Sequence, residues 1–296
     1  MQGNSLRLAA CGLAIAFALP ASAQAPPSPA VNSLMTTRVD SEIKIDPSGA
    51  LLDYRSETPL PDNVRVSLEK QVRSWRFEPV LVQGQPVTAR ARMRVTLAAR
   101  DLGNEQYAVS VDNVTFPANN QAVMPDAPPA AATIASRKIG APGYPMSLAR
   151  AGVSGMVLLY LRLSPEGRVL EAVPVQTSLF NAQGSAQTLA QGVKAFEQSS
   201  VRAAREWQFD VQVLAGATPN ARDLTVSMPV EYHAPGHRET RPGQWRTEVR
   251  GERREAAWLR GDAQAQRIGV SDLDSGDLLP LASAVRLTSE VKGVAL

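Results

Sequence analysis

The strongest constraint on the fold is an internal repeat, in which one short pattern occurs twice. Residues 45–53 and 163–171 each read as a strand, a Pro-x-Gly turn and a second strand. Proline fixes φ at the start of such a turn, and the glycine (Gly49 or Gly167) adopts the positive φ that a tight hairpin needs. Both copies then reach a Trp-x-Phe motif, at Trp75 and Trp207. About 14 more residues separate glycine from tryptophan in the second copy, and we assign them to an insertion at 178–192.

A helix is expected before each tryptophan, because apolar residues recur there at helical spacing. Pro61 marks the start of the first helix, with Asp62 or Asn63 as its N-cap. A tryptophan at the end of an amphipathic helix is usually a core anchor, so both tryptophans are expected to be buried. The apolar faces consist of Val64, Leu68, Val72 and Trp75 in the first copy and of Phe196, Ala204 and Trp207 in the second.

Each copy ends in a strand with period-two alternation, which is typical of a sheet with one solvated face. Residues 90–97 alternate apolar side chains with Arg90, Arg92 and Arg94, so the three arginines are expected to face solvent. Residues 106–116 add one more strand to the first copy. The closing strand of the second copy carries Leu224, Val226, Met228, Val230 and Tyr232 on one face.

These patterns predict an α+β protein with two small units, each an antiparallel sheet with a helix packed on one face. The units cover residues 34–117 and 139–234, and a Pro/Ala-rich linker at 118–138 joins them. The second unit has an additional opening, in which a short helix begins at Pro145 and ends at Gly152.

Residues 235–296 are expected to form a charged tail that is partly helical or disordered. The helical part is expected at 252–266, where charges of both signs are mixed. The acidic run from Asp272 to Asp277 lacks the spacing and the terminal Glu of a calcium loop, so it predicts a solvated turn.

The N-terminus has the three-part layout of a secretory signal peptide, which we place at residues 1–23. Arg7 precedes an apolar run at 8–19, Pro20 follows it, and Ala21-Ser22-Ala23 forms a small-x-small cleavage site. The run is shorter than the roughly 20 residues that span a bilayer as a helix. A cleaved, periplasmic protein is therefore expected.

Residue usage argues against several chemistries. Cys11 is the only cysteine, and His233 and His237 are the only histidines, so the usual zinc sites and thiol catalysis are not expected. A net charge of +3 gives no strong electrostatic footprint for nucleic acid. We find no paired carboxylates in a pocket-like context and no nucleophile elbow, so no catalytic residue, metal or cofactor is expected.

The second unit resembles the TonB C-terminal domain family over residues 142–233, about a third of the chain. The first unit matches only from its hairpin onward and lacks the Tyr-Pro opening. The residues that carry the resemblance occur in the family's order, and they are Tyr144, Pro145, Gly152, Gly155, Gly167, Trp207 and Phe209.

Members of that family are energy transducers whose terminal domain adds a strand from an outer-membrane receptor peptide to its own sheet. The resemblance implies a periplasmic module that binds an outer-membrane receptor or another envelope protein by strand addition, with a link to TonB-dependent transport. The implied pairing strand is Leu224 to Tyr232, and homodimer formation stays open. This chain departs from the family because it has no lasting anchor and no long Pro-rich arm, so force transmission from the inner membrane is not expected. An envelope enzyme and a structural adaptor are the alternatives.

The signal-peptide assignment predicts that the mature protein begins at or within a few residues of Gln24 and leaves the cell with the periplasmic fraction. N-terminal sequencing of the released protein measures this directly. Retention in the inner membrane with Met1 still attached would contradict it.

Overall fold

The computed structural model describes residues 33–296, except for residues 83, 105, 118–130, 237–239, 263–264, 266, 275–276 and 282–284. The expected signal peptide and the first part of the expected linker lie outside the described residues. In chain order the elements are β1 (Ser33–Ile45), β2 (Leu51–Ser56), α1 (Asp62–Arg73), β3 (Leu81–Val82), β4 (Gln85–Pro86), β5 (Ala89–Gly103), β6 (Gln106–Thr115), β7 (Ala132–Lys138), α2 (Met146–Arg150), β8 (Ser154–Leu163), β9 (Val169–Phe180), α3 (Ala186–Ala204), β10 (Gln208–Val213), β11 (Thr225–Tyr232), β12 (Arg246–Arg250), the 3-10 turns η2 (Ala257–Leu259) and η3 (Val270–Asp272), and β13 (Leu279–Pro280).

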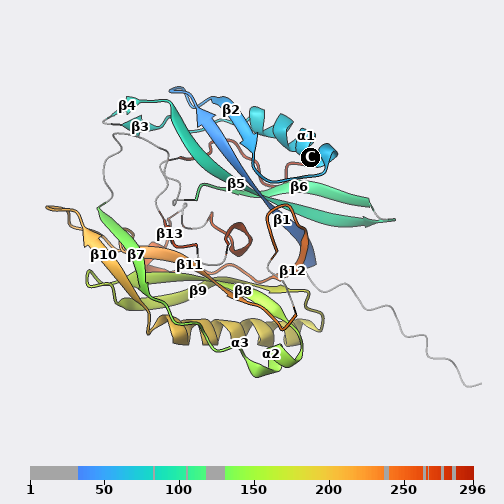
Figure 1. Cartoon of the computed structure of the whole chain (residues 1–296), viewed down its shortest axis with the longest axis vertical. Helices are drawn as coiled ribbons and strands as arrows, with labels where there is room; N and C mark the ends of the chain where they lie inside the picture. Colours follow the sequence, from blue (N-terminus) through green and yellow to red (C-terminus); the bar gives the residue numbers. More distant parts are fainter. Residues whose placement is uncertain are drawn as a thin grey trace, which may run out of the picture.

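One large antiparallel sheet dominates the α+β architecture. Eight of its nine strands follow the order β13-β11-β8-β9-β12-β1-β5-β6, and the ninth, β2, pairs with β1. Figure 1 shows α1 on the outer side of the first half of the sheet (β1, β2, β5 and β6) and α3 on the outer side of the second half (β8, β9 and β11). C-terminal segments lie between the two halves. The α+β class is confirmed, but the two units are not clearly separate. Strand β12, from the expected tail, pairs with β1 at residues 33–36 and with β9 at residues 178–180 and so joins them.

The internal repeat is visible in main-chain geometry. The N–H of Phe77 donates to the carbonyl of Gly49 at 2.9 Å, and the N–H of Phe209 donates to that of Gly167 at 2.8 Å. The two glycines have φ of +86° and +80°, and a Cβ on either would lie 2.0 Å or less from the phenylalanine carbonyl oxygen. Each turn therefore requires glycine for its φ and for its close approach to backbone.

The extra residues of the second copy extend regular elements, so the expected insertion at 178–192 is not a separate loop. Residues 178–180 complete β9, which has 12 residues where β2 has 6. Residues 186–192 begin α3, which has 19 residues where α1 has 12. Asp62 is the first residue of α1 and not its N-cap, because Pro61 occupies the cap position without a side-chain hydrogen bond.

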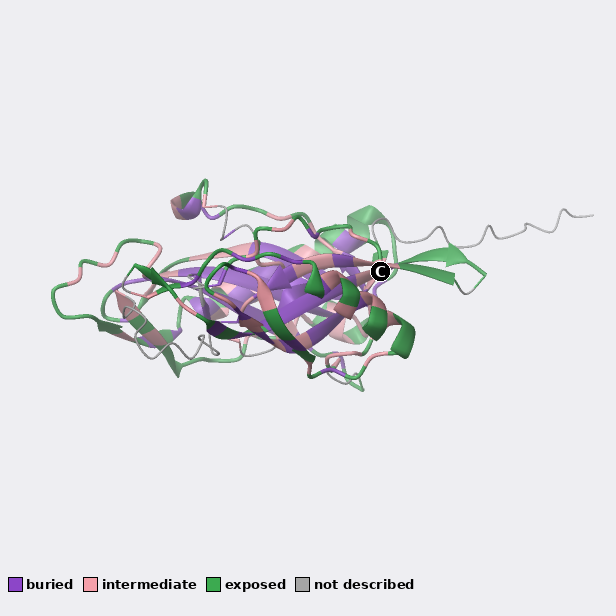
Figure 2. Ribbon diagram, turned by 90° about the horizontal axis from the view of Figure 1, so that it is seen from above, coloured by how far each residue is buried: buried purple, intermediate pink, exposed green. Residues whose placement is uncertain are grey.

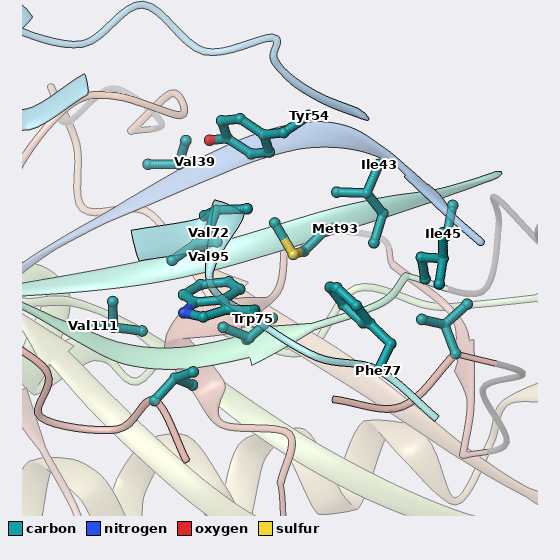
Figure 3. Packing of buried hydrophobic residues seen from close by; sticks show 14 of the residues in the cluster. Val39, Ile43, Ile45, Tyr54, Val72, Trp75, Phe77, Met93, Val95 and Val111 are labelled. Carbon is teal, nitrogen blue, oxygen red and sulfur yellow. The ribbon is translucent and has the colours of Figure 1, made fainter. Parts of the chain in front are cut away.

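Each half of the sheet builds its own core under its helix. Figure 3 shows Trp75 among Val72, Val95 and Val111, which come from α1, β5 and β6. Trp207 occupies the corresponding place under α3. Both tryptophans are 3% exposed, so the expectation that they are core anchors is confirmed.

A third core lies between the halves and was not expected. Met156, Leu158 and Tyr160 of β8 face it, and they pack against Val270 and Leu273 of the C-terminal segment. The alternate residues of β8 face α3, so this strand is buried on both faces. Figure 2 shows the corresponding band of buried strands through the middle of the molecule. Residues Met156 to Leu161 of β8 form a continuous apolar run, which is the pattern of a strand covered on both sides.

The C-terminal segment also differs from the expected charged tail. Within the described part of 252–266, the helical residues are Ala257–Leu259, a single 3-10 turn, in place of the expected helix. A solvated turn was expected from Asp272 to Asp277, but its first two residues, Asp272 and Leu273, are buried between the halves. Part of the expected linker is ordered as well, because Ala132–Lys138 forms β7 and pairs with β10.

Arg94 is buried because the C-terminal segment covers its face of the sheet. Arg90 and Arg92 are exposed as expected, but Arg94 is 7% exposed. It forms ion pairs with Asp40 of β1 at 2.6 Å and with Asp274 and Asp277 at 2.7 and 3.1 Å. The expectation of a solvated face fails here because the C-terminal segment covers this face.

The core assignment predicts that Trp75→Ala and Trp207→Ala each lower the free energy of unfolding by about 3–5 kcal/mol. Urea unfolding of the whole chain, followed by circular dichroism, measures the loss. Trp75→Phe and Trp207→Phe keep most of the buried ring and serve as controls with a smaller loss. A loss below about 1 kcal/mol for either alanine variant would show that its tryptophan is not a core residue.

Candidate binding edges

The predicted partner-binding side chains of β11 point into the core. Leu224, Val226, Met228, Val230 and Tyr232 are at most 8% exposed. The last four lie in the core cluster under α3. A partner strand beside β11 would therefore meet its backbone and the intervening residues and not these side chains.

The chain itself covers part of the outer edge of β11. Leu163 donates to the carbonyl of Leu224, so even-numbered residues of β11 turn their backbone groups to β8 and odd-numbered ones face outward. Of the outward donors, Thr225 bonds Arg222 at 3.0 Å, and Ser227 lies opposite Leu279 of β13. Pro229 has no N–H to offer.

The C-terminus covers the opposite end of the sheet. Gly293 donates to the carbonyl of Val111 in β6 at 2.7 Å, and Val111 donates to Val294 at 2.9 Å. Leu296 then donates to Val109 at 2.9 Å. The same segment thus covers part of both outermost strands of the large sheet, which is a known protection against edge-to-edge pairing.

Strands β7 and β10 form a separate two-stranded ribbon whose outer strand is uncovered in the described residues. Strand β7 pairs there with β10 alone. Leu214 donates to the carbonyl of Ala131, so residues 133 and 135 face β10. The backbone groups of Ala132, Ile134 and Ser136 consequently face outward. Figure 1 shows the ribbon beside the second half of the sheet.

The ribbon is fixed to the protein at its base. Ile134 and Val211 pack against the core under α3. The indole N–H of Trp207 donates to the carbonyl of Gly140 at 2.8 Å and so holds the chain just after β7. Sequence analysis missed β7 because alanine and proline before it suggested a linker. The available signal was the β-branched pair at 133–134 within a stretch that lacks proline and glycine.

The family-motif aromatic Tyr144 belongs to a packing cluster. Its ring meets Phe196 and Tyr232 edge to face, with centroids 5.7 and 5.6 Å apart. The rings of Phe196 and Tyr232 stack at 4.3 Å. A Cβ at Gly155 would lie 2.8 Å from the Phe196 ring, so glycine is needed for this packing.

The remaining motif residues also have structural positions. Pro145 is the N-cap of α2, and Gly152 follows that helix with φ of +66°. Gly167 contacts the backbone of Phe209, and the side chains of Phe209 and Trp207 are both buried in the core under α3. The motif is therefore explained by packing and by turns.

A buried polar network joins the C-terminal segment to the sheet. Glu248 of β12 is fully buried and receives hydrogen bonds from Arg250 at 2.7 Å and from the hydroxyl of Ser271 at 2.7 Å. Arg250 also pairs with Asp112 of β6 at 2.7 Å. Burial lowers the pKa of Arg250, but the two carboxylates outweigh burial and raise it. Arg250 is therefore a structural cation.

Asp272 is the buried carboxyl of this network. Burial raises its pKa above the ordinary value of 3.8, although hydrogen bonds from Thr96, from the Gly269 N–H and from Asn113 act in the opposite direction. The group is 2% exposed and is enclosed by its donors, and it also contributes to the lining of a cavity between the sheet and the C-terminal segment. Across the described chain, no cluster of three or more His, Cys, Asp and Glu side chains is arranged to hold a metal.

Comparisons with known proteins found no match to a family model, to a curated protein or to a solved structure.

The raised pKa of Asp272 predicts a pH dependence of stability. Its folded pKa lies above its unfolded value, so its contribution is fully present below 3.8 and is lost as pH rises through the folded pKa. Asp272→Asn is a neutral isostere, since its oxygen accepts from Gly269 and Asn113 and its amide donates to the Thr96 hydroxyl. Measured by urea unfolding from about pH 3 to about pH 7, the variant should gain stability relative to the parent as pH rises. A difference that does not change with pH would contradict this.

Proposed function

We propose that this protein is a binding module of the cell envelope that recognises an extended peptide segment by strand addition. The observation that carries the proposal is the ribbon. Its outer strand β7 presents three outward backbone N–H groups, while the chain's own C-terminal segment covers part of the outer edges of β11 and β6. An extended peptide beside β7 would satisfy those groups.

The strand implied by the family resemblance, β11, is less suitable as it stands. Its outward donors at Thr225 and Ser227 already have partners in the chain, and Pro229 interrupts the series. The mode of recognition implied by the resemblance is therefore kept, and the strand that performs it is moved from β11 to β7.

The side chains of β7 indicate the chemistry of the partner. Thr133, Ala135 and Ser136 are small and exposed, so a strand can approach closely over this part. Arg137 and Lys138 are exposed at the end of β7, and the nearest carboxylate to Arg137 is Asp210 at 3.8 Å. An extended peptide with an acidic residue near the Arg137 end fits these charges.

The proposed location is the periplasm, and it depends on the signal-peptide assignment. No helix among the residues that the structure describes has the length and apolarity to cross a membrane. The proposed partners are outer-membrane receptors or other envelope proteins, with a role in TonB-dependent transport as the family resemblance implies.

The test compares Ser136→Pro with Ser136→Ala. Proline removes the outward N–H of an exposed residue, whereas alanine removes the hydroxyl and keeps the N–H. Peptides are first selected from a phage-displayed library of random extended sequences against the whole protein. Affinity for a selected peptide should fall roughly tenfold or more in Ser136→Pro and stay near the parent value in Ser136→Ala, because one backbone hydrogen bond is lost.

Amide chemical shifts on titration then locate the peptide. Shifts confined to 131–138 and 208–214 support the proposal. Shifts elsewhere with equal affinity for both variants would move the site away from β7. Failure of the library to yield any binding sequence would favour the structural adaptor, in which the C-terminal segment covers the sheet edges and no peptide is recognised.

A further inference from the structure

A cavity of about 840 Å³ lies between the sheet and the C-terminal segment. Residues 112–116, around the end of β6, form one wall, and residues 260–262, 267–269 and 285–292 form much of the other. The C-terminal segments that contribute to it lie between the two halves in Figure 1. The volume is within the range of about 300–1,000 Å³ that is usual for small-molecule sites.

The cavity has a cationic mouth and an apolar part in its interior. Arg260, Arg267 and Lys292 line the cavity and are exposed, so these charges lie where it opens to solvent. Leu281 and Val285 also line it and are only 2% and 3% exposed. Apolar walls beneath charged groups fit a ligand with a carbon body and a charged head.

The positive charge of the lining exceeds what its own carboxylates compensate. Three of the five carboxylates in the described lining are paired with arginines that also line it, and the pairs are Asp112–Arg250, Asp262–Arg222 and Glu78–Arg286. The other two are Glu290, which is exposed, and Asp272, which is enclosed by its donors. Four cations of the lining form no ion pair in the part of the chain that the structure describes, and they are Arg253, Arg260, Arg267 and Lys292.

Arg253 is the most firmly held of these four cations. Its guanidinium donates to the carbonyls of Ala265 and Ile268 and to the hydroxyl of Tyr160 at 3.1 Å. These acceptors are neutral and take three of the five N–H groups, so the charge is not compensated and two donors remain. A planar guanidinium with free donors is suited to a carboxylate or a phosphate group. Arg267, which precedes Ile268 in the chain, supplies a second guanidinium to the same cavity.

Thr115 gives an independent indication of a missing polar partner. Its side chain lines the cavity and is 8% exposed. Its hydroxyl has no hydrogen-bond partner among the described residues. A buried hydroxyl without a partner is unfavourable, and a polar atom that enters the cavity would remove this cost.

We propose that this cavity binds a small organic anion. The carbon body of the anion lies against Leu281 and Val285, and its carboxylate or phosphate group lies at Arg253 and Arg267. The site shares no residue with the ribbon of β7 and β10, so the proposal goes beyond the proposed function and does not depend on it.

Three probes with the same eight-carbon chain test the head group and the body separately. Octanoate and octyl phosphate carry the two anionic head groups, and octanol is their neutral control. Amide chemical shifts of the whole protein, followed during titration, give the affinity and the location of each probe. At least one of the two anions should bind roughly tenfold or more tightly than octanol, because charge-assisted hydrogen bonds are the stronger ones. The anion that binds more tightly identifies the head group.

Two variants of the chain test the assigned arginines. Arg253→Gln should weaken binding of the anion roughly tenfold or more, and Arg267→Gln should weaken it several-fold. Arg267 is exposed, and its hydrogen bond to the Leu287 carbonyl is 3.4 Å long, so its replacement keeps the test valid if Arg253→Gln does not fold. Arg90→Gln removes an exposed arginine outside the cavity and should leave the affinity unchanged.

Shifts at residues 112–116, 253, 267–269 and 285–292 support the proposal. Absence of binding by both anions would overturn it, as would octanol that binds as tightly as they do. Unchanged affinity in both cavity variants would also overturn it. Shifts confined to 131–138 and 208–214 would assign the probe to the ribbon and overturn this inference, while the peptide experiment on β7 would remain unaffected.

Discussion

The cluster of ion pairs around Arg94 is the interaction on which the rest of the arrangement depends. Asp40 comes from β1, and Asp274 and Asp277 come from the C-terminal segment, so one guanidinium connects the sheet to that segment. Burial alone lowers the pKa of Arg94, but the three carboxylates more than offset this and raise it. A buried cation with compensating partners is stable in place, whereas removal of the partners would leave an uncompensated charge. The covering of the large sheet's outer strands follows from this attachment, because the same segment supplies β13 and the C-terminal residues on β6.

This attachment also explains why the two halves of the sheet present different side chains to the C-terminal segment. The first half presents Arg94 and Thr96 to the C-terminal segment, and the second half presents Met156, Leu158 and Tyr160. The segment matches the chemistry of each half. Its carboxylates face the first half, and Val270 and Leu273 pack against the second half. Its sequence therefore mixes charged and apolar residues and resembles a solvated tail when it is considered without its partners.

The proposed binding function depends on which strand edges remain available once the segment is in place. A sheet edge with unpaired backbone groups attracts another strand, and proteins usually cover such edges. Here the covering is unequal, because the C-terminal segment pairs part of the outer edges of β11 and β6, whereas the outer edge of β7 has no partner strand within the residues that the structure describes. In this proposal the incoming peptide would lie beside a strand that packs on the core under α3 and is followed at once by the hydrogen bond from Trp207 to Gly140.

The sequence alone determined the local elements: the repeated hairpins, the helices before Trp75 and Trp207, and the alternating strands, because turn chemistry and hydrophobic period act over a few residues. It also determined the burial of both tryptophans. Tertiary structure alone decided that β12 joins the two units, that Arg94 is buried and that the edge of β11 is partly covered. These features pair residues that are far apart in the chain, such as Arg94 with Asp277 and Ser227 with Leu279. No local pattern encodes such a pairing, because its free energy arises only when distant segments exclude water together.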